Sequence, residues 1–79
     1  MPTDIWLHIK DAPGCHVIIR TGGAKVPDET LLFAAQICAE RSGAGAGAPI
    51  DWTLRKFVKK PSGAKPGQVI YDHQKTIYV

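Results

Sequence analysis

One segment of this sequence has the length and spacing of a helix, and short runs typical of β-strands lie on both sides of it. Within residues 28–42 the apolar side chains recur at helical spacing, and several are small enough to let a helix approach a sheet closely. Phe33 and Ile37 fall outside this stripe, so they either cover a second part of the sheet or form a modest exposed apolar patch. The expected buried face consists of Leu31, Leu32, Ala34, Ala35, Cys38 and Ala39.

The sequence also marks where this helix begins and ends. Asp28 is expected to be the N-cap, and Glu29 lies beside the positive end of the helix dipole. Gly43 is placed to end the helix in the left-handed conformation. Residues 43–48 alternate Gly and Ala, which is typical of a mobile linker.

The N-terminal part predicts an antiparallel hairpin. Apolar residues alternate with polar or ring-bearing ones along 5–10, residues 16–20 are rich in β-branched side chains, and 11–14 have turn chemistry. We favour a five-residue loop, 11–15, because it separates polar from apolar side chains, whereas a four-residue loop would mix them. The outer face would then carry Trp6, His8, Lys10, His16 and Arg20.

The C-terminal part predicts further short strands. Residues 50–53 and 57–58 are strand-like, with a bulge or brief turn between them. Residues 69–71 and 76–79 are expected to form a closing hairpin in which Ile70 faces Ile77. The predicted fold is α+β, with a mostly antiparallel sheet of about five strands packed on one helix in the order β-β-α-β-β-β. A chain of 79 residues has room for one core, so residues 1–79 are expected to form a single domain.

The composition is that of a soluble protein with a mild excess of positive charge. Ten Lys and Arg against seven Asp and Glu give a net charge of +3. No apolar run approaches the ~20 residues of a membrane span, and the N-terminus lacks the features of a secretory signal. We expect a cytoplasmic location and no membrane partner. Cys15 and Cys38 are interpreted as reduced core residues, with a disulfide as the alternative.

The positive charges are strongly clustered. Half of the ten basic residues fall within positions 55–65, where no acid occurs: Arg55, Lys56, Lys59, Lys60 and Lys65. Such a loop suits a series of phosphates, although a merely solvated loop is the alternative. The outer face of the first hairpin favours the first interpretation, because rings and cations together are typical of surfaces for single-stranded or looped RNA. Trp6 is the exception, since it fits an ordinary core position equally well.

Other chemistry is poorly supported. No pair of cysteines or histidines has the spacing of a metal site, so we expect neither a metal nor another cofactor. His16 directly follows Cys15 and would point to the opposite face of a strand, which excludes them as a catalytic pair. The aspartates lie at the ends of predicted elements, where capping and turns account for them. We therefore predict no catalytic residues and no small-molecule substrate.

Several motifs in the same order resemble the NFACT-R domain, the C-terminal RNA-binding domain of the RqcH and fibronectin-binding protein A family of ribosome quality-control proteins. The resemblance covers nearly the whole chain, at residues 4–8, 13–20, 34–35, 51–53 and 58–71. It implies contact with tRNA and the large ribosomal subunit during rescue of stalled translation. The positions that match the family's most characteristic motifs are Trp6, His8, Gly14, His16, Arg20, Lys59, Lys60, Gly63, Lys65 and Gly67.

Two departures from the family pattern concern affinity. The family usually has Ser at the position of Cys15, a change that weakens a hydrogen bond. It commonly has polar and basic residues at 43–48, so either phosphate contacts and RNA affinity are reduced here or the linker is simply longer and looser. The resulting hypothesis is a non-catalytic RNA-binding module. The alternatives are a protein-interaction or adhesin domain of the fibronectin-binding type and an accessory domain of an RNA-modifying enzyme.

Overall fold

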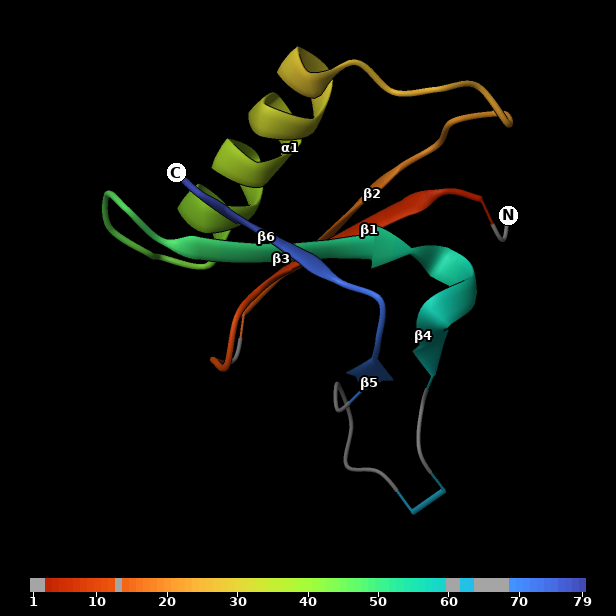
Figure 1. Ribbon diagram of the computed structural model, residues 1–79. Coiled ribbons are helices and arrows are strands. Elements are labelled where there is room, and N and C mark those ends of the chain that lie inside the picture. Colours follow the sequence, from red (N-terminus) through yellow and green to blue (C-terminus); the bar gives the residue numbers. More distant parts are fainter. Residues whose placement is uncertain (1–2, 13, 60–61, 64–68) are drawn as a thin grey trace.

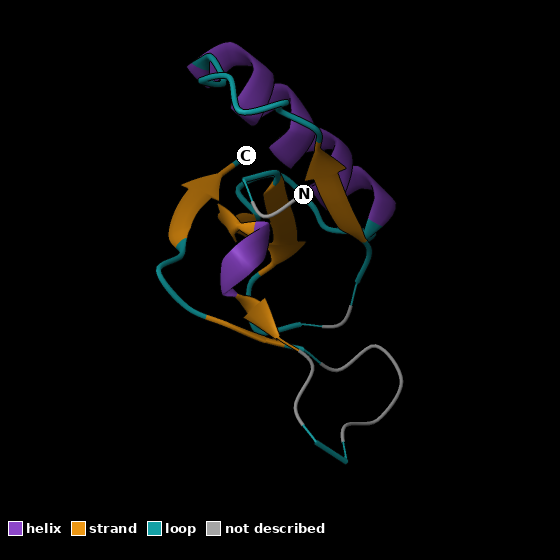
Figure 2. Cartoon of the chain, turned by 90° about the vertical axis from the view of Figure 1, so that its right-hand side faces the viewer, coloured by secondary structure: helices purple, strands orange, loops and turns teal. Residues whose placement is uncertain are grey.

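A four-stranded antiparallel sheet carries one helix on one face and a small two-stranded ribbon beside the other (Figures 1 and 2). The computed structural model describes residues 3–12, 14–59, 62–63 and 69–79. The sheet has the strand order β2-β1-β3-β6, and β4 pairs with β5 in the ribbon. The elements are β1 (Ile5–Ile9), β2 (His16–Ile19), α1 (Asp28–Arg41), β3 (Pro49–Leu54), a 3-10 turn (Arg55–Phe57), β4 (Val58–Lys59), β5 (Ile70–Tyr71) and β6 (Lys75–Tyr78).

The α+β class is confirmed, but the strands divide between two sheets where we expected one sheet of about five. The 3-10 turn confirms the break predicted between the third and fourth strands. It turns the chain out of the main sheet directly after Leu54, so the fourth strand starts a separate layer.

The faces of the first hairpin are those the alternation predicts. Trp6 lies opposite Ile18, and His8 lies opposite His16. A loop spanning 11–15 would instead have set Lys10 opposite His16. The observed register therefore differs from the predicted one by two residues. Every side chain stays on its expected face, because strand side chains alternate with a period of two.

The predicted closing hairpin is wrong. Ile77 pairs with Ile50 of β3, whereas Ile70 pairs with Lys59 of β4. His73, between β5 and β6, has a positive φ of 57°. As an edge strand beside β3, β6 brings Ile77 and Val79 against the core, a burial that pairing with the ribbon would not provide.

Both ends of the helix are well defined. Asp28 is the first helical residue rather than the expected N-cap, which is Pro27; the carbonyl of Pro27 accepts the N–H groups of Thr30 and Leu31. At the C-terminal end, Gly43 has the predicted positive φ, at 71°. The N–H of Gly43 bonds the Glu40 carbonyl and that of Ala44 bonds the Ala39 carbonyl, which is a Schellman cap.

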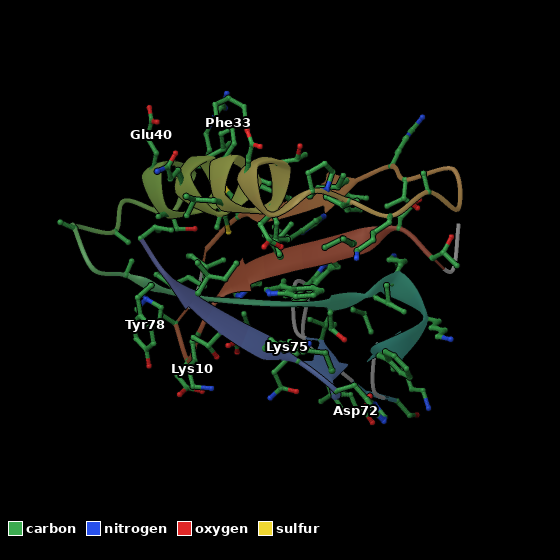
Figure 3. All side chains as sticks on the ribbon, turned by 45° about the horizontal axis from the view of Figure 1, so that its top comes forward. Lys10, Phe33, Glu40, Asp72, Lys75 and Tyr78 are labelled. Atoms are coloured by element: carbon green, nitrogen blue, oxygen red, sulfur yellow. The ribbon has the colours of Figure 1, made fainter. Side chains whose placement is uncertain are left out.

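The helix buries a narrower stripe than the sequence predicts. Leu32 was expected in the core but is 43% exposed, and Phe33 is 63% exposed and points away from the sheet in Figure 3. The four strands cover only part of the helix circumference, which leaves Leu32 and Phe33 outside the contact. The buried core of helix and sheet comprises Ile5, Leu7, Leu31, Ala34, Ala35, Cys38, Ala39, Ala48 and Ile50.

The two cysteines differ in their surroundings. Both are free thiols, but only Cys38 is in the core, where burial raises the pKa of its thiol. Cys15 is exposed, contrary to expectation, because it lies in the loop that joins β1 to β2. Within the described ranges, no helix is long and apolar enough to cross a membrane.

Candidate nucleic-acid interface

The face of the sheet opposite the helix carries the ring-bearing residues that the sequence placed there. Trp6 is central to it, with the ring of His8 parallel at 5.4 Å and that of His16 at 6.4 Å between centroids. The ring of Tyr71 from the ribbon packs on Trp6 at 4.7 Å, tilted by 54°. Trp6 is therefore only 4% exposed, which confirms the core alternative and leaves its ring covered.

A buried carboxylate fastens the ribbon to the main sheet. Asp51 is 1% exposed and accepts hydrogen bonds from the Tyr71 hydroxyl at 2.8 Å and the Thr76 hydroxyl at 2.6 Å. Burial and the bond to Asp51 together raise the pKa of the Tyr71 hydroxyl. The explanation of Asp51 as a capping or turn residue at a strand end is wrong, because Asp51 lies inside β3 and joins three segments of the chain.

Lys10 forms an ion pair with the carboxylate of Asp51. Its Nζ lies 3.7 Å from Oδ2 of Asp51, and its side chain is 38% exposed. The partial exposure weakens the ion pair but still allows it to offset some of the cost of burying a charge. Lys10 is thus partly engaged within the protein.

The loop between β1 and β2 is held by close backbone contacts. Nδ1 and Nε2 of His8 lie 2.7 Å and 3.2 Å from the carbonyl oxygens of Ile9 and Gly14. A Cβ atom at Gly14 would lie 2.5 Å from Oγ of Ser42, a hydroxyl that accepts the N–H of Cys15. Gly14 is required here by the close approach of the loop to the end of α1.

Four cations of the predicted surface are exposed, and one of them, Arg55, lines a hollow together with Trp6 and His16. Arg20 follows β2, Arg55 and Lys56 lie in the 3-10 turn, and Lys59 lies on the ribbon; all four are exposed. Nζ of Lys56 is 5.2 Å from the centroid of the Phe57 ring. Lys60, Lys65 and Gly67 lie outside the described residues, and Gly63 is exposed with a positive φ of 73° in open space.

Asp4 is buried next to two of these cations, Arg20 and Arg55. Its Oδ1 accepts the N–H of Thr21 at 3.1 Å, and this bond, helped by the charge of Arg20, lowers the pKa of the carboxyl. The backbone carbonyl of Asp4 accepts the N–H of Arg55 at 2.7 Å, which ties the 3-10 turn to the start of β1. Asp4 therefore positions the segments that bear Arg20 and Arg55.

Sequence reasoning missed the apolar members of this surface. Ile18, Val58 and Val69 line a hollow together with Trp6, His8 and His16. Ile18 carried a signal, since it lies on the polar face of the predicted hairpin. Val58 and Val69 did not, because their position depends on the pairing of β4 with β5. Among the described residues, no three His, Cys, Asp or Glu side chains are grouped so that they could hold a metal ion.

The fold and this surface define a class, an α+β domain with a cationic, ring-bearing sheet face. Comparison with known proteins shows which proteins are similar to this chain. No family model matches the sequence. The Rqc2 homolog RqcH of Bacillus subtilis (strain 168) is 52% identical over 79 residues, covering 96% of this chain and 13% of that protein. The Rqc2 homolog RqcH of Streptococcus suis is 40% identical over 78 residues, covering 96% of this chain and 14% of that protein.

A solved structure agrees with these relatives. The C-terminal part of the fibronectin/fibrinogen-binding protein of Streptococcus suis superposes with a TM-score of 0.91 at 38% identity, covering 100% of this chain and 32% of that one. The chain is therefore similar to one segment of the RqcH proteins and to the C-terminal part of that structure, in line with its resemblance to the NFACT-R domain. It spans about one seventh of the length of the RqcH relatives that it matches.

Proposed function

We propose that this chain is a non-catalytic RNA-binding module that contacts tRNA and the large ribosomal subunit during quality control of stalled translation in the cytoplasm. Its similarity to the RqcH proteins supports a role in ribosome quality control. The clustered cations support the ligand, because Lys and Arg without neighbouring acids provide the sequence-independent part of RNA affinity. All 79 residues would act as one unit.

The observation that carries this proposal is the attachment of the ribbon. Residues 55–65 hold five basic residues, and the part of this segment in β4 is paired with β5. Tyr71 of β5 packs on Trp6 and bonds Asp51, so the ribbon lies against the sheet face that bears His16. The described start of the basic segment therefore lies on the same side of the main sheet as the exposed side chains of the first hairpin.

The test combines RNA recovery with salt dependence. RNA is recovered from cells that express the domain, at two ionic strengths, and identified; enrichment of tRNA and large-subunit rRNA is expected. If about three or four phosphates are engaged, log affinity falls against log salt with a slope of about −2 to −4. The triple variant Lys59→Ala, Lys60→Ala, Lys65→Ala should flatten that slope.

A charge-matched control separates this site from bulk electrostatics. The triple variant Lys25→Ala, Arg41→Ala, Lys75→Ala removes the same charge from other parts of the chain and should keep most of the slope. Equal losses in both variants would show that the 55–65 segment has no special role. An RNA preparation that is empty at both ionic strengths would refute RNA binding itself.

Protein binding is a second candidate because of the structural relative described as a fibronectin/fibrinogen-binding protein. Immobilised fibronectin provides the direct test. If this function holds, fibronectin binds the domain saturably while added RNA does not compete. We favour RNA because the face opposite the helix combines exposed cations with rings, which is common to RNA-binding sheets.

A further inference from the structure

Two adjoining hollows lie on the exposed side of the first hairpin. The smaller, about 220 Å³, is lined by Trp6, His8, Gly14, His16, Ile18, Arg55, Val58 and Val69. The larger, about 450 Å³, is lined by Asp4, Ile18, Arg20, Gly22 and Arg55. Ile18 and Arg55 border both, so the hollows are neighbours with a shared wall.

The smaller hollow has the walls that a flat ring favours. Trp6 is buried and forms part of the floor of this hollow, whereas His16 is exposed and Ile18 is 43% exposed. The ring of His16 is stacked toward Trp6 on one side and forms no hydrogen bond with another described residue, so its nitrogens and its other face are available. A volume below the ~300 Å³ lower bound for drug-sized ligands fits a single ring system.

The larger hollow has the charge that a phosphate favours. Arg20 and Arg55 are both exposed, and neither guanidinium forms an ion pair with another described residue. Asp4 also lines this hollow, but it is 5% exposed, and its Oδ1 accepts the Thr21 N–H. A guanidinium group can donate two parallel hydrogen bonds to the oxygens of one phosphate, so Arg20 and Arg55 could bind a phosphate at the edge of this hollow.

We propose that the two hollows form a site for one unpaired nucleotide of an RNA chain, with the base in the smaller hollow and its phosphate between Arg20 and Arg55. The inference rests on the proposed RNA-binding function and states which RNA the surface selects. A base in a duplex is stacked and paired on its edges, so it cannot enter the smaller hollow without being turned out. The domain therefore binds single-stranded or looped RNA more tightly than a blunt duplex.

The first experiment compares two RNAs in one assay. Fluorescence anisotropy is measured with labelled oligouridine and with a blunt RNA duplex of equal length, at one ionic strength. Oligouridine should bind more tightly. His16→Val keeps a strand-forming residue but removes the ring, and it should weaken oligouridine binding by about 5-fold or more, since stacking on one side chain contributes at least that much. Duplex binding should not change.

Matched controls test the assignment of each side chain. His73→Asn removes an exposed imidazole that lines neither hollow, while Asn tolerates the positive φ found there. Arg55→Ala is compared with Arg41→Ala, which removes the same charge from the end of α1. Only His16→Val and Arg55→Ala should lower the preference for oligouridine over duplex.

The second experiment probes the site without an RNA chain. Uridine 5′-monophosphate, uridine and inorganic phosphate are titrated separately while NMR shifts are followed. The monophosphate should shift the signals of both His16 and Arg55. Uridine alone should shift only those of His16, and inorganic phosphate alone only those of Arg55. If the monophosphate moves neither, or if both RNAs bind equally and His16→Val changes nothing, the nucleotide site is refuted while RNA binding stands. Monophosphate shifts without any RNA affinity would instead support the site and refute the proposed RNA function.

Discussion

The bond between Tyr71 and Asp51 offers a sharp test of how the ribbon is attached. Tyr71→Phe removes the hydroxyl 2.8 Å from Oδ2 of Asp51 and keeps the ring on Trp6. Hydrogen bonds to charged groups contribute about 1.5–3 kcal/mol, and the partial exposure of Tyr71 places this one near the lower end, at about 1.5 kcal/mol. For a domain of this size, that loss lowers the Tm by about 6–12 °C.

The chain contains its own control for this measurement. Tyr78 is 71% exposed, and its hydroxyl forms no hydrogen bond with another described residue. Tyr78→Phe should therefore change the free energy of unfolding by no more than about 0.5 kcal/mol. Both variants are measured by urea unfolding and calorimetry, and hydrogen exchange should show faster opening of the Ile70 amide in Tyr71→Phe alone. Equal stability of the two variants would contradict the argument that Asp51 holds the ribbon.

Two further predictions concern the loop at Gly14 and the behaviour at high pH. Gly14→Ala introduces a Cβ 2.5 Å from Oγ of Ser42 and should cost about 1–3 kcal/mol in urea unfolding, whereas Gly45→Ala, in open space, should be close to neutral; similar midpoints for the two variants would show that the loop yields freely. Because the folded state raises the pKa of Tyr71, the unfolded chain loses this proton first as the pH rises above about 10, and the free energy of unfolding falls. Solvent screening keeps the slope below the limit of about 1.4 kcal/mol per pH unit for one proton. Tyr71→Phe should be less sensitive to alkali than the parent chain, and identical profiles would exclude Tyr71 as the cause.

Local pattern was sufficient to locate the hairpin and the helix along the chain. Alternation along β1 and β2 determines which side chains share a face, and this is independent of the exact register as long as the shift is even. The turn from α1 into Gly43 was also predictable, because a left-handed residue is needed to close the cap. These features depend on residues close together in the sequence.

Pairing between distant segments was not predictable in the same way. Ile77 is a suitable neighbour for either Ile70 or Ile50, and its pairing with Ile50 brings it against the core. The burial of Trp6 follows from that choice, since β5 is then free to pair with β4 and place Tyr71 over the ring. Asp51 carried one signal that we misinterpreted, a carboxylate within an apolar run, which indicates a distant donor.

The ribbon also determines where this domain tolerates changes in chain length. Val58 pairs with Tyr71, and Lys59 pairs with Ile70, so both ends of the intervening segment are anchored close together while β3 and β6 pair independently of it. Insertions or deletions between Lys59 and Ile70 therefore leave the helix and main sheet intact, and related proteins can differ in reach and charge here while retaining the same scaffold.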